Sequence, residues 1–250
     1  MLNDFQTTFF QREGYVSGIP VAKKDEVTYF RQAFDQLSET EGQDQARAGF
    51  FDRHFEQRFI WELATHPKIL DCVADVIGPD ILLLSTHCFC KYGPEEKFVA
   101  WHQDLRYWGL EPPVEVTAWF AIDDSDQGNG CMQVVPRIHR SRLLEHGKSE
   151  RSGNLLSINQ SIDLSPEEVE TAVDCVLRAG EISLHDGMLV HGSLPNRSSR
   201  RRCGMAIRYV PTHVRPITEG PMGTNWKWRP ILVRGEDRHA HFDLQPRPFT

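Results

Sequence analysis

The chain has 250 residues, of which 40% are hydrophobic and 25% are charged, a composition typical of a globular protein in water. Its formal net charge of −7 and sequence pI of about 5.9 argue against a nucleic-acid partner, because the chain would repel a polyanion. No apolar run approaches the ~18 residues of a membrane span, and residues 1–5 lack the basic and apolar regions of a signal peptide. We therefore expect a cytoplasmic protein with no nucleic-acid and no membrane partner.

A single domain over residues 1–250 is expected, because no Pro- or Ser-rich linker, charge block or internal repeat marks a boundary. Within residues 1–79, apolar side chains recur at the three-to-four spacing of amphipathic helices, with a short strand over 14–16. The helical pattern over 61–76 is broken near Pro67, and from Asp80 the pattern changes to strand. We expect these N-terminal helices to pack on a β-rich core over about 80–215.

Three segments of that core combine strand and turn signals with polar residues. The first is His102-Gln103-Asp104, which precedes a β-rich run over 114–122. The second, over 129–140, is a turn followed by a short apolar strand, and nothing near it resembles a helix. The third, over 180–193, ends in His191-Gly192-Ser193. These segments predict antiparallel strands whose turns and ends carry the chemistry.

Two histidines and one carboxylate in these segments predict an iron site. Residues two apart in an extended strand point to the same side, so His102 and Asp104 could both reach one metal while Gln103 faces away. His191 would supply the third ligand from elsewhere in the chain. Fe(II) suits this ligand set, because imidazole and carboxylate on one face leave the opposite positions open for an oxidant and a cosubstrate.

The segment from Lys91 to Tyr209, about half of the chain, resembles the phytanoyl-CoA dioxygenase family of non-haem Fe(II) enzymes that use 2-oxoglutarate and O2. The resemblance rests on His-Gln-Asp with its following aromatic pair, on Asn-Gly-Cys-x-x-Val-x-Pro-x-x-His over 129–139, and on His-Gly-Ser-x-x-Asn over 191–196 with a downstream arginine. These motifs occur in the family's order. The resemblance implies a mainly β fold with flanking helices, a double-stranded β-helix of the jelly-roll, cupin-like kind.

The resemblance also implies a role for individual residues. His102, Asp104 and His191 would be the iron ligands. Arg202, eleven residues after His191, matches the arginine that binds the distal carboxylate of 2-oxoglutarate, and its planar fork suits that carboxylate. Three further positions match places that line the cosubstrate pocket in relatives: Ser193, Lys91 and Trp119.

The reaction implied is hydroxylation of a small organic molecule, with release of succinate and CO2 and with ascorbate as a supporting reductant. Halogenating relatives replace the carboxylate ligand with a small residue, whereas this chain keeps Asp104. Desaturation and ring closure stay open, because they depend on where the substrate sits. The family spans acyl-CoA, compatible solutes, phosphonates and secondary metabolites, so the resemblance does not choose a substrate.

Four residues are candidates for substrate contacts. Arg106, Tyr107 and Trp108 directly follow the first ligand pair, where aromatic rings and a cation could hold an anionic or ring-bearing molecule; the alternative is that they pack a loop. Arg208 falls on the same strand face as Arg202 if no bulge intervenes, and the alternative for it is a salt-bridged strand residue. Residues about 216–250 would form a lid, an edge segment or a dimer contact, in a monomer or homodimer.

Other patterns support competing interpretations less well. His185 and Asp186 are adjacent strand residues that face opposite ways, so the pair would not chelate one metal. The six cysteines lack C-x-x-C spacing, which favours free thiols in a reducing compartment over a zinc site. Two other functions remain: a catalytically silent metal-binding jelly roll, and a zinc or manganese cupin enzyme. The intact iron and 2-oxoglutarate residues argue against the first, and the absence of an added Glu and His near the first ligand pair argues against the second.

Overall fold

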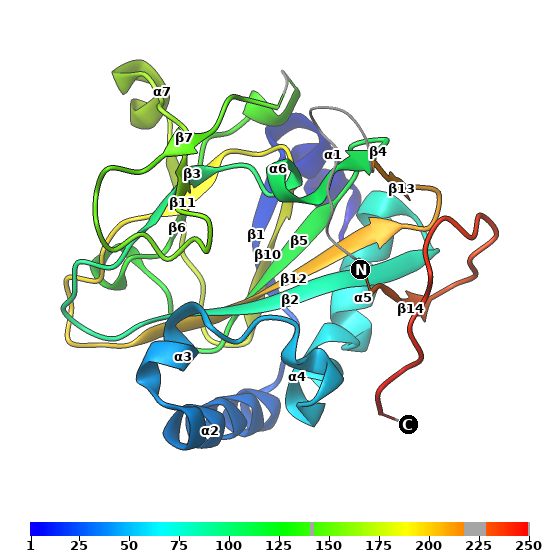
Figure 1. The fold of residues 1–250 in the computed structure, drawn as a ribbon, viewed down its shortest axis with the longest axis horizontal. Coiled ribbons are helices and arrows are strands. Elements are labelled where there is room, and N and C mark those ends of the chain that lie inside the picture. The colour runs from blue at the N-terminus through cyan, green and yellow to red at the C-terminus, as the bar shows by residue number, and fades with distance from the viewer. Residues whose placement is uncertain (141–142, 218–228, 250) are drawn as a thin grey trace.

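The structure is a computed structural model that describes residues 1–140, 143–217 and 229–249. Two antiparallel sheets face each other (Figure 1). The larger has the strand order β1 (Tyr15–Pro20), β10 (Glu181–Asp186), β5 (Val116–Ala121), β12 (Arg202–Pro211), β2 (Ile81–Lys91) and β14 (Ile231–Arg234). The smaller has the order β3 (Val99–His102), β11 (His191–Ser193), β6 (Met132–Val134) and β9 (Val173–Cys175). This is the double-stranded β-helix that the sequence predicts.

Helices from the N-terminal part cover the outer face of the larger sheet, as Figure 1 shows for α2 to α5. The first helix begins at Asn3, whose side chain accepts from the backbone N–H of Gln6, and it ends at Gly14, which has a positive φ of 85°. Pro67 starts a new helix at its first position, which explains the predicted break. The helices here are α1 (Asp4–Glu13), α2 (Lys24–Glu41), α3 (Gln43–Ala48), α4 (Arg58–Ala64) and α5 (Pro67–Ile77).

Strand alternation divides the larger sheet into an apolar outer face and a functional inner face. In β5, Val116, Ala118 and Phe120 pack with the helices in the main hydrophobic core. Between them, Thr117 and Trp119 face the cavity between the two sheets. Burying the outer face against Phe30, Phe34 and Leu37 of α2 fixes the sheet, because burial removes apolar surface from water. The inner face is thereby free to carry polar side chains.

The sequence predicted one extended strand through His102 and Asp104, but the structure has a helical turn at Asp104. Strand β3 ends at His102, and Asp104 has helical backbone angles, φ −61° and ψ −41°, at the start of the short helix α6 (Leu105–Trp108). The stretch over 129–140 also carries helical turns at its ends. These 3-10 turns are η2 (Gln127–Asn129) and η3 (Ile138–Arg140), and another, η1 (Arg53–Phe55), precedes α4. Short turns of this kind lack the repeated apolar spacing by which longer helices are recognised.

Several short elements complete the fold. Two small sheets pair β4 (Leu110–Glu111) with β13 (Arg215–Pro216) and β7 (Gly147–Lys148) with β8 (Gln160–Ser161), and the last short helix is α7 (Pro166–Glu170). Strand β14 lies beside β2 at the edge of the larger sheet. The part of the predicted lid over 218–228 lies outside the described residues. Within the described ranges, we find no helix whose length and apolarity would let it cross a bilayer.

Candidate active site

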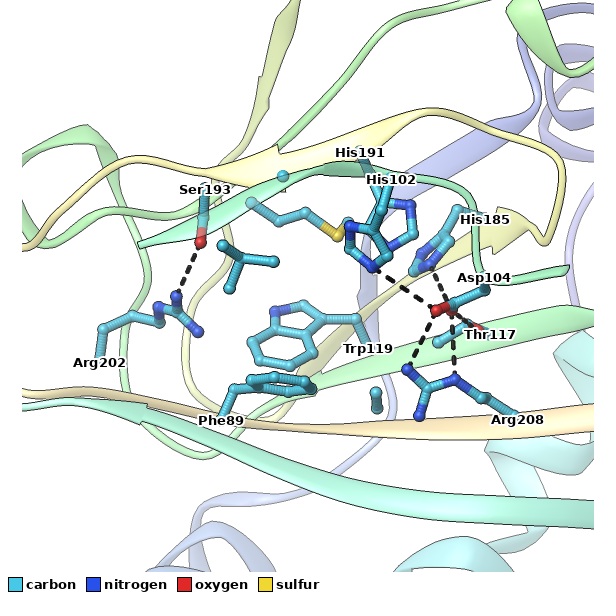
Figure 2. A pocket seen from close by; sticks show the side chains of 14 residues that line it. Phe89, His102, Asp104, Thr117, Trp119, His185, His191, Ser193, Arg202 and Arg208 are labelled. Atoms are coloured by element: carbon cyan, nitrogen blue, oxygen red, sulfur yellow. Dashed lines mark hydrogen bonds and ion pairs between the residues drawn. The ribbon is translucent and has the colours of Figure 1, made fainter. Parts of the chain in front are cut away.

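Three candidate metal ligands meet in the cavity between the sheets (Figure 2). His102 ends β3 and His191 begins β11, and the two residues are direct partners across this antiparallel pair. Their ring centroids are 4.1 Å apart. Asp104 reaches the same place from the turn after β3, and one ligand atom from each of the three residues lies within 4.8 Å of the others. All three side chains are buried, so the set forms a compact site shielded from water.

Hydrogen bonds fix both imidazoles in the form that binds a metal. His102 Nδ1 lies 2.9 Å from the carbonyl of Ala100, and His191 Nδ1 lies 3.0 Å from the carbonyl of Leu189. A carbonyl can only accept, so each Nδ1 carries the proton and each Nε2 keeps a free lone pair. Burial, above all other causes, lowers the pKa of His191 well below its ordinary value. His191 is therefore neutral near pH 7, as a metal ligand must be.

A buried arginine holds the carboxylate of Asp104. Arg208 donates from Nε to Oδ2 at 3.2 Å and from Nη2 to Oδ1 at 3.1 Å. Asp104 is 1% exposed and Arg208 is 6% exposed. Burial alone would raise the pKa of Asp104, but Arg208 and the neighbouring histidines hold it well below its ordinary value. The carboxylate is thus ionised and oriented without a metal.

A second carboxyl group reaches Asp104 through Thr117. The hydroxyl of Thr117 lies 2.8 Å from Asp104 Oδ2 and 2.7 Å from Glu115 Oε1. One hydroxyl proton cannot serve two ionised carboxylates, so one carboxyl must be protonated. Burial and then the charge of Asp104 raise the pKa of Glu115 well above its ordinary value. Glu115 is accordingly the protonated acid, which donates to Thr117, and Thr117 donates to Asp104.

Two buried cations form a cradle for an anion on the other side of the same cavity. Lys91 donates to the hydroxyl of Ser193 at 2.6 Å, and Arg202 donates to it at 3.2 Å, so that hydroxyl keeps its own proton for a further acceptor. Lys91 is 0% exposed and Arg202 is 2% exposed. Within the described part of the chain, neither cation has an ion pair with a carboxylate. Burial, and secondarily Arg202, lowers the pKa of Lys91 well below its ordinary value, and a bound anion would counter this effect.

Trp119 lies between this cradle and the metal ligands (Figure 2). Its indole N–H is buried and has no partner among the residues that the structure describes, so it can donate to a molecule that spans the cavity. The ring packs under the guanidinium of Arg202, 5.3 Å from its centroid. Gly204 permits this position, because a Cβ there would overlap the indole. The donors of the cradle and of Trp119 therefore suit a dicarboxylate cosubstrate reaching toward the metal.

The residues proposed for substrate contacts separate into two groups. Tyr107, Trp108 and Arg208 line a second cavity, which adjoins the metal ligands at Asp104. Arg106 is exposed and does not line it. No bulge interrupts β12 between Arg202 and Arg208, so the two arginines share a face as predicted, and Arg208 is salt-bridged to Asp104. Arg208 thus forms the salt bridge that the sequence left as its alternative, and it also lines this cavity.

Sequence reasoning missed His185, which lies inside the metal cavity. Its Nε2 is 3.6 Å from Asp104 Oδ2, and its ring centroid is 4.3 Å from that of His191. The sequence argument considered His185 and Asp186 only as a pair and overlooked His185 alone. The alternation of Ile182 and Leu184 toward the core was the available signal, because it places His185 on the opposite face.

The three candidate ligands form a set of the two-histidine, one-carboxylate type, which is the ligand set of non-haem Fe(II) oxygenases. Residues 10–204 match the family described as Phytanoyl-CoA dioxygenase (PhyH), and the chain belongs to that family. The family and the donor set of the cavity both indicate Fe(II) and 2-oxoglutarate as cofactors.

Three known proteins illustrate this relationship. The peroxisomal phytanoyl-CoA dioxygenase of Homo sapiens is 27% identical over 159 residues, which are 62% of this chain and 47% of the human protein. The chain thus matches about half the length of that relative. The non-heme monooxygenase ThoJ in its apo form is 28% identical with a TM-score of 0.78, covering 97% of this chain and 88% of ThoJ. CytC3 with Fe(II) and alpha-ketoglutarate shares the fold at 22% identity, with a TM-score of 0.69 over 98% of this chain and 93% of CytC3.

Proposed function

We propose that this protein is an Fe(II)- and 2-oxoglutarate-dependent dioxygenase that hydroxylates a small organic molecule and releases succinate and CO2. The observation that carries the proposal is the pairing, in one cavity, of the two-histidine, one-carboxylate set with two buried cations that have no carboxylate partner in the described ranges. Both cations donate to the carbonyl of Gly130 and to the Ser193 hydroxyl, and Lys91 also donates to the carbonyl of Leu194, but these neutral acceptors leave two buried positive charges without a counter-ion, which favours an anionic ligand. A silent metal-binding jelly roll has no need of that cradle.

The residues divide into a metal-binding group and a cosubstrate-binding group. His102, Asp104 and His191 would hold iron, which when bound supplies the activation of O2. Arg202 and Lys91 would bind the distal carboxylate of 2-oxoglutarate, with the Ser193 hydroxyl donating to it. Trp119 would donate to the body of the cosubstrate. These side chains bind, orient and shield the reactants from water.

The setting of Asp104 supports hydroxylation over halogenation. Its carboxylate fills the ligand position, and Arg208 and Thr117 hold both of its oxygens. A halide would need that position to be empty. All six cysteines are buried and free, as expected for a protein in a reducing compartment, and we therefore propose a cytoplasmic location. We also propose that residues 1–250 form one domain, in a monomer or homodimer.

The test is an anaerobic titration of the Fe(II)-loaded protein with 2-oxoglutarate, which follows the weak visible charge-transfer band of a bidentate chelate. Arg202→Ala should keep iron but require roughly 30- to 150-fold more cosubstrate, because losing a hydrogen-bonded charge costs about 2 to 3 kcal/mol in a buried site. Arg200→Ala is the matched control. Arg200 belongs to the same arginine run but is exposed and paired with Asp126, so the titration should not change.

Two results would contradict the proposal. If iron binds and the wild type gives no band at any 2-oxoglutarate concentration, the cradle does not serve this cosubstrate, and the silent jelly roll or a zinc or manganese enzyme replaces the oxygenase. If Arg200→Ala weakens the band as much as Arg202→Ala, the effect is one of general charge and not of the cradle.

A further inference from the structure

The second cavity lies at the opposite end of the same strands from the anion cradle. Three side chains of β2, those of Lys91, Phe89 and His87, lie on the same face of the sheet, because residues two apart in a strand share a side. On β12, Arg202 and Arg208 lie on that face ~20 Å apart along the strand, from six residues at about 3.3 Å each. Phe89 and Arg208 line both cavities. The metal ligands therefore stand between the cosubstrate cradle and this second cavity.

Five of the eleven residues that line the second cavity carry aromatic rings. His87 packs against Phe51 at a centroid distance of 5.3 Å and against Phe89 at 4.1 Å. Tyr107 and Trp108 of α6 supply two more rings, 6.2 Å apart. Flat, apolar walls of this kind favour a ligand with its own ring or rings, which can stack or pack edge to face.

The two cavities differ in volume. The open volume is about 250 Å³ in the second cavity and about 40 Å³ at the metal site. An apolar cavity of about 150 Å³ holds a benzene molecule, so the second cavity has room for about two rings. The exposed residues Ser157 and Ile158 are also part of its lining, so it opens to the surface there. An organic substrate would therefore enter this cavity and meet the metal at Asp104.

The lining residues that the structure describes offer no counter-ion for a charged substrate. Its two charged side chains, Asp104 and Arg208, are paired with each other. Burial first, and Arg208 second, lowers the pKa of His87 to about 4, so this histidine is neutral near pH 7. A phosphate, a carboxylate or an ammonium group placed here would be buried without a partner among the described lining residues, which is strongly unfavourable.

Two polar atoms remain for an uncharged oxygen. Arg208 Nη1 is buried and has no partner in the part of the chain that the structure describes. His87 Nε2 donates to the carbonyl of Ala48 at 2.8 Å, so its Nδ1 is an acceptor. Within the oxygenase proposed above, on which this step rests, we infer that the substrate is an uncharged one- or two-ring compound with a carbonyl or hydroxyl oxygen. A phosphonate inside the cavity would lack a counter-ion among these lining residues.

The test uses three probes of similar size on the protein loaded anaerobically with Fe(II) and 2-oxoglutarate. These are 1-tetralone, which is neutral and has a carbonyl, tetralin, which lacks the carbonyl, and 2-naphthoate, which is anionic. Dissociation constants come from calorimetry and from the change in the charge-transfer band. We expect 1-tetralone to bind at least about tenfold more tightly than 2-naphthoate and about three- to tenfold more tightly than tetralin.

Single substitutions test whether 1-tetralone binds in the second cavity. Ala48→Trp fills the cavity and should weaken 1-tetralone at least about tenfold while the charge-transfer band of bound 2-oxoglutarate stays. Gln32→Trp, on the exposed side of α2, is the control and should change nothing. If Ala48→Trp loses the band, Ser157→Trp at the exposed rim takes its place.

The outcomes separate the two proposals. A wild type without the band overturns the oxygenase itself. A normal band with 2-naphthoate bound as tightly as 1-tetralone overturns the uncharged-substrate inference alone. Unchanged 1-tetralone binding in the filled variant, with the band intact, also overturns it.

Discussion

The ion pair between Arg208 and Asp104 should stabilise the metal-free protein strongly, and Arg208→Met tests this. At an effective dielectric constant of about 20, two charges about 4 Å apart attract by about 4 kcal/mol. The pair makes two hydrogen bonds and is nearly excluded from solvent, so removing Arg208 leaves a buried carboxylate without its arginine counter-ion. We expect the free energy of unfolding to fall by about 3 to 5 kcal/mol, measured by urea titration at pH 7 without metal.

The double variant separates the pair from general damage to the fold. Asp104→Asn alone leaves the Arg208 cation buried, whereas Arg208→Met with Asp104→Asn leaves no unpaired charge. The double variant should be more stable than the sum of the single effects predicts, by at least about 2 kcal/mol. Arg200→Met, which breaks the exposed pair with Asp126, is the control and should cost no more than about 1 kcal/mol. Additive effects of the two single substitutions would refute the reasoning.

A bound divalent metal should reduce the difference in stability between Arg208→Met and the wild type. In Arg208→Met, bound Mn(II) would replace the positive charge that Arg208 provides beside Asp104 in the wild type. The metal should therefore raise the free energy of unfolding of this variant more than that of the wild type. Equal stabilisation of both proteins by saturating Mn(II) would show that metal and arginine do not act on the same carboxylate.

Three other perturbations follow from the structure. Arg202→Lys keeps a positive charge but loses the planar fork, so the 2-oxoglutarate titration should shift by about tenfold, less than in Arg202→Ala. Gly204→Ala should displace Trp119, lowering the urea-derived stability by about 1 to 3 kcal/mol and weakening 2-oxoglutarate in the same titration. Burial, and secondarily Arg229, lowers the pKa of His54 to about 3, below its unfolded value, so the unfolded state binds more protons. The contribution of His54 to the free energy of unfolding is complete above pH 6.5 and is lost as the pH falls toward 3. Between these values, His54→Gln should reduce the slope of the free energy of unfolding against pH by up to about 1.4 kcal/mol per pH unit. An unchanged slope in the metal-free protein would contradict this.

The sequence by itself determined the local periodicity and the residue types of the site. Apolar spacing predicted helices within residues 1–79, with a break near Pro67, and a strand over 14–16, because a helix and a strand bury different repeats of positions. The structure has helices at Lys24–Glu41 and Pro67–Ile77 and a strand that begins at Tyr15. The metal set was also readable, since His102 and Asp104 are near neighbours and His191 stands in a recognisable motif.

Only the tertiary structure decided which distant side chains meet. The pairing of β10 with β5 places His185 opposite Thr117, inside the metal cavity. The packing of β12 on β2 and β5 brings Arg208 to Asp104 and leaves the aromatic cavity beside them. Residue patterns record which face of an element is buried, but the register between strands far apart in the chain depends on the packing of the whole core. For that reason the residue pattern indicated the metal and the family resemblance implied the cosubstrate, whereas the partner of the carboxylate ligand and the shape of the substrate cavity came from the fold.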